Sequence, residues 1–519
     1  MTNLKTIAKS VCLAAAASLC SCSLDLGNYD YKELNNITIS GVDDNINVLV
    51  YDRLTLNPVL EPDVATENYT FEWKAISNDE NQEVTIIGED LALDYKMALL
   101  PGEYSLYLTV TEKASGLFWR QSYTLTVSEV TSEGWMVLCS DNGRARLDMI
   151  SSVTSQTYFD ILKDNGMPEL NGPRKIQWLK EKTSPDSPFY LLADDGATRL
   201  GRNSFSWKPE YDFSYEVAVV KKLKPYSIVT AGFGKMIVSD TEAYYCEVMG
   251  IDGLYGSAVN KDFKVAPYIG ANTQAAAYAS VYLLYDIDHG KFMAYCPLME
   301  YPDLGGQNPL VTMEEMEKIA ISLKGTDAVI SEGFDEYPEG MECLYMENTG
   351  YDPGNGKMGR TYAVLDDGGK IYVYGIQMGD LMMFSDCTFV LGKSYKGELT
   401  GCQGIAEENC LYAFSSLKNY MYYASGDKVY RVDLNDDVLQ AKLQITVPGE
   451  KITCLKFANC QTEAYSSRKY DLIVGSEKDG AGTLRIYEGL KSEGDFTNVT
   501  PEKFDGFKTI KDVTFRERN

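Results

Sequence analysis

A single histidine limits the catalytic chemistry open to this chain of 519 residues. His289 is that histidine, and it stands in the turn-like run Asp286-Ile-Asp-His-Gly290. A Ser-His-Asp site would have to use His289 itself, and a zinc site built from several histidines is excluded by count. We therefore predict an exposed turn residue at position 289, and the sequence assigns neither a catalytic residue nor a cofactor.

Carboxylates leave two other kinds of chemistry open. Glycosidases need two Asp or Glu side chains roughly 5–9 Å apart across a sugar, but 75 acidic residues make such pairs unavoidable by chance. Residues 433–437 and 351–356 carry closely spaced oxygen ligands of the kind that calcium requires. Neither run matches the EF-hand loop. We interpret both as tight polar turns and predict no metal site.

Cys22 carries the most specific chemical signal. Lys5 and Lys9 precede an apolar stretch over residues 11–19 and then small residues, which is the pattern of an export signal. The run Leu19-Cys-Ser-Cys22 resembles the lipobox of bacterial lipoproteins, in which the cysteine becomes the lipidated N-terminus. The resemblance implies a signal peptide over residues 1–21 and lipid on Cys22. The alternative is an ordinary cleaved signal.

Charge and aromatic content limit the kinds of partner that the protein can bind. Acidic residues outnumber basic ones by 75 to 48, for a formal charge of −27. This charge opposes binding to phosphate backbones, so nucleic acid is not an expected partner. Thirty-seven tyrosines and five tryptophans supply amphipathic contact surface. Such a surface suits capture of a glycan or a peptide.

Nine cysteines follow the predicted anchor, and several, such as Cys139 and Cys246, lie in apolar runs where a buried thiol is expected. Two pairings remain open in an oxidising envelope: Cys402 with Cys410, and Cys454 with Cys460. Spacing alone does not decide between paired and free thiols.

The first part of the mature chain has the pattern of a small β-domain. Residues 22–35 are polar and aperiodic, as in a tether. Residues 69–74, 104–110 and 123–127 alternate between apolar and polar side chains, with turn residues between the runs. A period of two indicates antiparallel strands. We therefore predict an Ig-like β-sandwich over residues 36–130.

A family resemblance adds to this prediction. The runs Gly27-Asn-Tyr-Asp-Tyr31, Phe71-Glu-Trp73 and Pro101-Gly-Glu-Tyr104 resemble those of the PKD-like lipoproteins. The resemblance implies a lipid anchor in the outer membrane beside uptake systems of the starch-utilisation type, whose proteins are possible partners. It favours the cell surface over the periplasmic face, although residues 23–27 lack the acidic cluster usual for surface export. It supplies no catalytic residues.

Residues 131–519 repeat one theme, an apolar strand followed by an Asp- or Gly-containing turn and a second strand. Seven such hairpins follow one another at about 55-residue intervals, near the period of propeller blades with insertions. We predict an irregular β-propeller of about seven blades; two consecutive sandwiches are the alternative. The first strands of the hairpins are residues 135–139, 189–193, 236–238, 281–285, 362–365, 421–424 and 471–474.

The sequence also predicts two helices inserted among the strands. Apolar spacing predicts an inserted helix over residues 313–323 and a second helix over residues 156–163. The longest turn-rich connections, residues 150–188, 297–342 and 347–360, are expected to line the ligand face.

The predicted function is that of a lipid-anchored cell-envelope protein that captures a ligand or docks onto an uptake complex. A carboxylate-based glycosidase or lyase on the propeller is the alternative.

The anchor has a direct test. We expect Cys22→Ser to move the protein from the membrane fraction to the supernatant, because the acyl chains supply the membrane affinity. Cell fractionation with a fatty-acid label measures both changes, and Cys20→Ser is the matched control. A wild-type protein that takes up no label would remove the anchor.

Overall fold

The computed structural model describes residues 36–79, 82–163, 165–179, 189–201, 205, 207–232, 234–247, 253–272, 281–300, 308–325, 328–351, 359–378 and 389–517. Cys22 lies outside these ranges. No helix among them is long and apolar enough to cross a membrane. Internal contacts divide the chain into two compact units, which meet in sequence at Val127 and Ser128.

The first unit is a β-sandwich with an Ig-like arrangement. A five-stranded sheet in the order β2-β9-β8-β5-β6, in which β9, β8, β5 and β6 pair antiparallel, packs with two small sheets, β1-β4 and β3-β7. The strands are β1 (Thr38–Ser40), β2 (Asn45–Leu49), β3 (Arg53–Leu56), β4 (Val59–Glu61), β5 (Tyr69–Ser77), β6 (Val84–Gly88), β7 (Leu93–Lys96), β8 (Gly102–Glu112) and β9 (Phe118–Ser128).

The predicted alternation in this unit is confirmed. Strands β5, β8 and β9 contain all three alternating runs, and their alternate residues enter one core. Trp73 is fully buried in that core and stacks on Tyr123 with ring centroids 6.0 Å apart. Its indole nitrogen donates to the carbonyl oxygens of Asp90 and Leu91 at 3.1 and 3.2 Å. The buried indole is thereby satisfied at its polar end.

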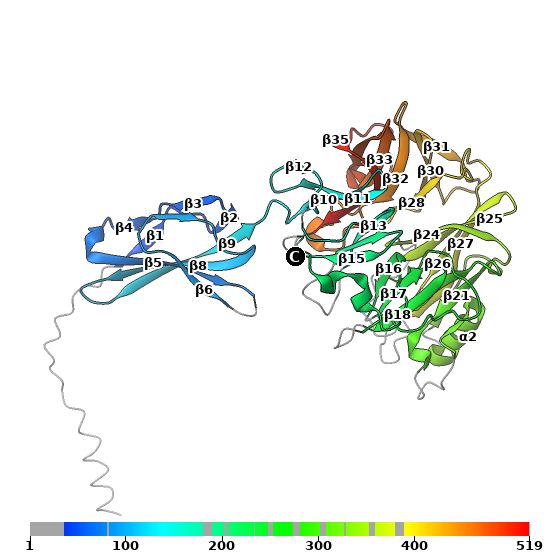
Figure 1. The fold of residues 1–519 in the computed structure, drawn as a ribbon, viewed down its shortest axis with the longest axis horizontal. Coiled ribbons are helices and arrows are strands. Elements are labelled where there is room, and N and C mark those ends of the chain that lie inside the picture. The colour runs from blue at the N-terminus through cyan, green and yellow to red at the C-terminus, as the bar shows by residue number, and fades with distance from the viewer. Residues whose placement is uncertain are drawn as a thin grey trace, which may run out of the picture. The chain divides into compact units, whose positions relative to one another are not determined.

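The second unit contains seven sheets among its described residues (Figure 1). We number them as blades 1 to 7 in the order β36-β10-β11-β12, β13-β15, β16-β18, β19-β22, β24-β27, β28-β31 and β32-β35. Strand β23 (Ala328–Glu332) extends blade 5 by pairing in parallel with its outermost strand, β27.

The strands of blades 1 to 4 are β10 (Gly134–Asp141), β11 (Arg144–Ser151), β12 (Thr157–Tyr158), β13 (Pro173–Trp178), β14 (Phe189–Ala193), β15 (Ala197–Leu200), β16 (Pro225–Ala231), β17 (Gly234–Ser239), β18 (Glu242–Glu247), β19 (Gly270–Ala271), β20 (Tyr282–Asp286), β21 (Lys291–Tyr295) and β22 (Leu310–Thr312). Those of blades 5 to 7, with the closing strand, are β24 (Glu342–Thr349), β25 (Arg360–Asp367), β26 (Lys370–Gln377), β27 (Phe389–Glu398), β28 (Leu411–Phe414), β29 (Tyr420–Ser425), β30 (Lys428–Asp433), β31 (Ala441–Thr446), β32 (Lys451–Phe457), β33 (Leu472–Lys478), β34 (Ala481–Tyr487), β35 (Glu502–Phe507) and β36 (Thr509–Arg516). The helices are α2 (Met313–Lys324), α3 (Gly489–Ser492) and the 3₁₀ turns η1 (Thr66–Asn68), η2 (Pro209–Tyr211), η3 (Phe213–Glu216), η4 (Pro297–Glu300) and η7 (Glu463–Tyr465).

The seven sheets close into a ring. Each innermost strand contacts the innermost strand of the next blade, in the cycle β36, β13, β16, β19, β24, β28, β32 and back to β36. Strand β36, the last of the chain, supplies the innermost strand of blade 1 by pairing with β10, where Trp135 faces Phe515. The alternative of two consecutive sandwiches is wrong, because a continuous ring joins all seven sheets. The prediction of about seven blades is confirmed.

Hydrophobic clusters fill the spaces between blades. Among the described residues of this unit there are seven clusters, and each draws its side chains from two neighbouring blades. Alternate residues of β10 enter different clusters: Trp135 and Val137 pack towards blade 7, whereas Met136 and Leu138 pack towards blade 2. Burial on both faces explains why the central strands read as unbroken apolar runs.

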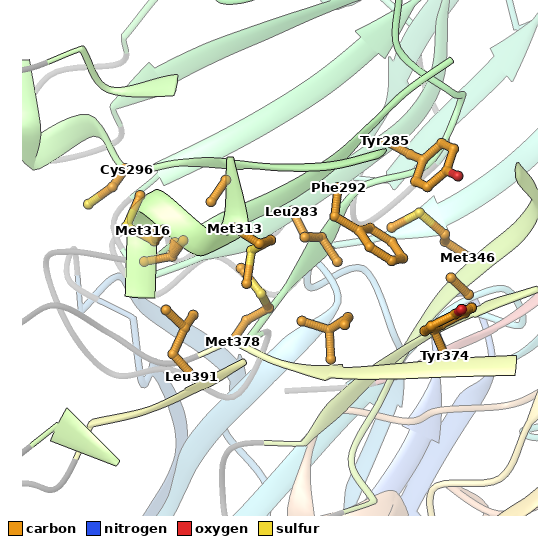
Figure 2. Packing of buried hydrophobic residues seen from close by; sticks show 14 of the residues in the cluster. Leu283, Tyr285, Phe292, Cys296, Met313, Met316, Met346, Tyr374, Met378 and Leu391 are labelled. Carbon is orange, nitrogen blue, oxygen red and sulfur yellow. The ribbon is translucent and has the colours of Figure 1, made fainter. Parts of the chain in front are cut away.

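The cluster between blades 4 and 5 shows how the inserted helix is held (Figure 2). Met313 and Met316 of α2 are fully buried beside Leu283, Met378 and Leu391. The helix prediction for residues 313–323 is confirmed. Its N-terminus carries a capping box in which the Thr312 hydroxyl accepts from the Glu315 amide at 3.3 Å.

The second predicted helix, over residues 156–163, is wrong. Thr157 and Tyr158 form the short strand β12, which pairs with β11. Asp160 follows with a positive φ of 51°, and its amide donates to the buried Asp148 carboxylate at 2.7 Å. Tertiary pairing and this side-chain acceptor override the apolar spacing that suggested a helix.

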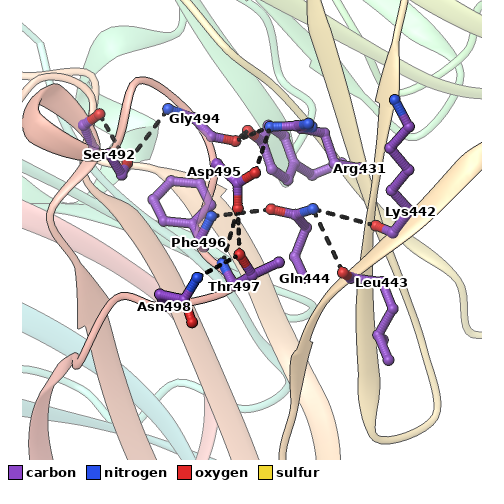
Figure 3. Close-up of polar contacts among 12 residues, drawn as sticks. Arg431, Lys442, Leu443, Gln444, Ser492, Gly494, Asp495, Phe496, Thr497 and Asn498 are labelled. Carbon is purple, nitrogen blue, oxygen red and sulfur yellow. Dashed lines mark hydrogen bonds and ion pairs between the residues drawn. The ribbon is translucent and has the colours of Figure 1, made fainter.

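Polar contacts also join neighbouring blades away from the centre (Figure 3). Gln444 on β31 accepts from the Phe496 amide at 2.9 Å, and Arg431 on β30 donates to the Gly494 carbonyl at 2.9 Å. Both partners belong to the connection before β35 in blade 7. These side chains give backbone groups of an irregular connection their hydrogen-bond partners.

Ring closure by β36 predicts a stability effect. Ile510 is fully buried between blades 7 and 1, so Ile510→Ala should lower the free energy of unfolding by about 2–5 kcal/mol. Urea denaturation measures the loss. Ile287→Ala, at a position 45% exposed, is the control and should stay within about 0.5 kcal/mol of wild type. Equal losses in the two variants would contradict the packing of β36.

Candidate functional site

The innermost strands each leave one edge without a partner strand, and side chains from neighbouring blades cover part of it. Asp512 on β36 accepts from the Ile176 amide of β13 at 3.0 Å, and Gln177 donates to the Ile228 carbonyl of β16 at 2.7 Å. The ring centre is therefore lined by polar side chains with positions fixed by backbone groups.

Two residues of β24 repeat this arrangement. Asn348 accepts from the Ala271 amide at 3.0 Å and donates to the Ile269 carbonyl at 2.9 Å, which joins blades 4 and 5. Glu347 accepts from the Phe414 amide of blade 6 at 2.9 Å. The side chains of β24 thus serve the strand edges on both sides.

Four charged side chains gather at the ring centre, and we call Lys175, Glu347, Lys456 and Asp512 the central cluster. They come from four innermost strands, β13, β24, β32 and β36. The Lys456 ammonium lies 2.7 Å from an Asp512 carboxylate oxygen, with side chains 25% and 7% exposed. The charges of the other three residues affect the pKa of Lys175. Among the described residues it has no ion-pair partner within 4 Å.

Burial and neighbouring charges shift the pKa values of three members of the central cluster. Loss of hydration raises the pKa of Glu347 to about 7, although the Phe414 amide and both lysines oppose the shift. Burial lowers the pKa of Lys175. For Lys456 burial also opposes the charge, but Asp512, Cys454 and Glu347 together outweigh it and the pKa is raised. The cluster therefore contains a carboxyl group that exchanges its proton near neutral pH and an ammonium group without a direct counter-ion.

Aromatic rings adjoin the cluster on the side of blades 4 to 6. The Tyr345 hydroxyl donates to Glu347 at 3.2 Å. Its ring lies 5.4 Å from that of Tyr268 and 5.6 Å from that of Tyr412, and the Tyr362 ring stacks on Phe414 at 4.5 Å. These tyrosines belong to the cores between blades, so a large share of the aromatic content is structural.

Residues 22–174 match the PKD-like family. A search of curated proteins finds no match. Among solved structures, the chain is similar to a quinonprotein alcohol dehydrogenase-like protein from Bacteroides thetaiotaomicron, at 13% identity over 91% of this chain and 97% of that one, with a TM-score of 0.43. It is similar to the PKD domain of human KIAA0319, at 24% identity over 20% of this chain and 88% of that one, with a TM-score of 0.16. It is also similar to the WD40 domain of SCAP from fission yeast, at 10% identity, 64% and 75% coverage and a TM-score of 0.30.

The PKD-like match agrees with the resemblance seen in the sequence. It covers the β-sandwich and runs into blade 2, where β13 begins at Pro173.

Most residues singled out in the sequence lie in turns. His289 is in the β20–β21 turn with its side chain 58% exposed, and its Nδ1 lies 2.8 Å from an Asp286 carboxylate oxygen. Asp433 accepts from the amide and the side chain of Asn435 at 3.0 and 2.9 Å, as in a tight polar turn. Residues 352–356 lie outside the described ranges, and the described residues contain no group of three or more metal-ligating side chains.

The proposed cysteine pairings are not formed. Cys402, Cys410, Cys454 and Cys460 are free thiols. Burial raises the pKa of Cys402 to about 11 and that of Cys454 to about 12, which keeps both thiols protonated and unreactive. Cys387 lies outside the described residues.

The connections expected to line a ligand face have different locations. Residues 150–188 and 347–360 include Lys175 and Glu347 of the central cluster, whereas residues 297–342 include α2, β22 and β23 beside blades 4 and 5. The central cluster was not predicted from the sequence. A charged residue within an apolar strand, such as Leu455-Lys456-Phe457, was the available signal.

The protonation of Glu347 predicts a pH effect on stability. Between its ordinary value of 4.5 and about 7, the folded protein holds a proton that the unfolded chain has lost. The free energy of unfolding therefore falls as pH rises through this range. We expect Glu347→Gln to gain about 1–3 kcal/mol relative to wild type between pH 5 and pH 8. Urea denaturation at both pH values tests this, with exposed Glu342→Gln as the control. An unchanged difference would show that Glu347 is ionised throughout.

Proposed function

We propose that this protein is a lipid-anchored cell-envelope binding protein whose propeller captures a polar ligand at the ring centre. The observation that supports this proposal is the central cluster. In it, Lys175 is half-buried and has no direct counter-ion among the described residues. An ammonium group that is partly removed from water and has no partner is destabilised. A polar or anionic group of a glycan or peptide would stabilise it.

The engagement of the carboxylates favours binding over hydrolysis. Asp512 uses one oxygen for Lys456 and the other for the Ile176 amide. Glu347 has one oxygen engaged by the Phe414 amide and the Tyr345 hydroxyl. Carboxylates that hold strand edges together are poorly placed as nucleophiles across a sugar.

Glu347 gives the second candidate function its support. A carboxyl group with a pKa of about 7 suits general acid or base chemistry. A carboxylate-based glycosidase or lyase would use this residue, and Glu347→Gln would then abolish turnover while leaving binding intact.

The cellular setting is a proposal from the sequence. Lipid on Cys22 would tether the chain to the outer membrane, with the PKD-like sandwich between the anchor and the propeller in sequence. The cell surface is favoured over the periplasmic face. An outer-membrane uptake complex is the proposed protein partner, with which the propeller would share or deliver its ligand.

The proposal has a binding test. The soluble chain from residue 23 onwards is screened against an oligosaccharide array and a peptide library, and the strongest binder is titrated by calorimetry. We expect Lys175→Met to weaken that binding by about tenfold or more, because an interaction with a charged group contributes about 1.5–3 kcal/mol. Exposed Lys451→Met is the matched control.

Two results would count against capture at the ring centre. One is the absence of binding anywhere in the screen. The other is a Lys175→Met variant that binds as tightly as wild type. Cleavage of the bound ligand that depends on Glu347 would replace the binding function with the enzymatic one.

A further inference from the structure

Arg360 is a buried arginine without a carboxylate partner. It is the first residue of β25, opposite Thr349 of the innermost strand β24, and only 5% of it is exposed. No Asp or Glu of the described chain lies within 4 Å of its guanidinium. This is unexpected in a protein with 27 more acidic than basic residues.

Three other arginines with little exposure have such a partner. Arg146, Arg431 and Arg485 have side chains 11–12% exposed. They pair with Asp148 at 2.7 Å, Asp495 at 3.7 Å and Glu450 at 2.8 Å. The protein therefore supplies an internal carboxylate in three comparable environments but not at Arg360.

The hydrogen bonds of Arg360 leave donors unused. Nη1 donates to the Tyr362 hydroxyl at 3.0 Å and reaches Asn419 Oδ1 at 3.4 Å, while Nη2 reaches the Ser394 carbonyl only at 3.5 Å. The buried Nε has no partner. A guanidinium has five N–H donors, so part of the fork is free for an acceptor.

The surroundings hold the guanidinium in a fixed position. The rings of Tyr351, Tyr362 and Tyr395 lie 5.5, 5.4 and 5.8 Å from its central carbon. The side chain crosses β26 at Gly375, where an added Cβ would lie 2.6 Å from Arg360 Cδ. Glycine at this position makes room for the arginine. The three rings stabilise its charge in part through cation–π attraction.

Solvent reaches the edge of this group of residues. Tyr351 and Tyr395 are half-buried, and Asn435, which accepts from Asn419 at 3.0 Å, is exposed. A ligand group arriving here would meet tyrosine rings before the guanidinium. Planar pairing of a guanidinium with a carboxylate is the strongest polar contact open to Arg360.

We propose that Arg360 binds the carboxylate of a ligand at the junction of blades 5 and 6, with Tyr351 and Tyr395 contacting the part of the ligand that carries it. The carboxylate belongs either to a uronic acid sugar or to the C-terminus of a peptide. None of the four residues of the central cluster contacts Arg360. The inference therefore does not depend on ligand capture at the ring centre.

The experiment uses matched probes with and without the carboxylate. Digalacturonic acid is compared with its methyl ester, and the tripeptide Gly-Gly-Phe with its C-terminal amide, by calorimetric titration of the soluble chain. We expect at least one acid to bind and its uncharged counterpart to bind at least tenfold more weakly. Arg360→Met should weaken binding of the acid by about tenfold or more.

Two further variants make the result specific. Arg431→Met, which removes an arginine already paired with Asp495, should retain the binding. Loss of acid binding in Lys175→Met but not in the Arg360 variants would place the probe at the ring centre and overturn the proposal. If Arg360→Met does not fold, Arg360→Lys keeps the charge without the planar fork and should bind with intermediate affinity.

The probes also separate the two sources of the carboxylate. Binding of the digalacturonate alone assigns a glycan, and binding of the tripeptide alone assigns a peptide terminus. The proposal is overturned if neither acid binds wild type, or if both Arg360 variants bind as tightly as wild type.

Discussion

The unpaired inner edges of the seven blades are the constraint on which the centre of the propeller depends. Each innermost strand has backbone groups that face no further strand, and buried backbone groups require partners. Asp512, Gln177, Asn348 and Glu347 supply those partners from one blade to the next. The same residues bring charge into the ring centre, so the means of closing the ring also creates the candidate site.

Burial then decides how this charge behaves. Asp512 and Lys456 compensate each other directly, whereas Glu347 and Lys175 rely on backbone dipoles and more distant charges. The two uncompensated groups are the ones whose pKa values move towards neutrality. Arg360 is a third charged group without a carboxylate partner among the described residues, and aromatic rings surround it instead. These groups are candidates for function because the fold alone leaves them incompletely satisfied.

The strands that could be predicted from the sequence are those with the clearest apolar pattern. All seven predicted hairpins correspond to the second and third strands of a blade, from β10 and β11 to β33 and β34. The second strand of each blade is buried on both faces along most of its length, which gives apolar runs such as Trp135-Met-Val-Leu-Cys139. Innermost strands such as Arg174-Lys-Ile-Gln-Trp178 mix charge with apolar residues and have no such signature.

The candidate site was not predictable for a related reason. Lys175 and Asp512 become neighbours only because β36 returns to the first blade, and no local pattern specifies that pairing. The inserted helix at Met313 was predictable because its cap and its apolar spacing are both local. The false helix at residues 156–163 shows the opposite case, in which pairing with β11 outweighs local spacing.

Because β10 pairs with β36, the order of synthesis determines when blade 1 can be completed. Trp135 is made long before Phe515, so blade 1 has only three of its strands until β36 has been made. Until then β10 presents an open edge to other chains, and open edges promote aggregation. A chain that stops before residue 509 keeps that edge permanently. Copies that lack β36 therefore differ from the others in the accessibility of β10.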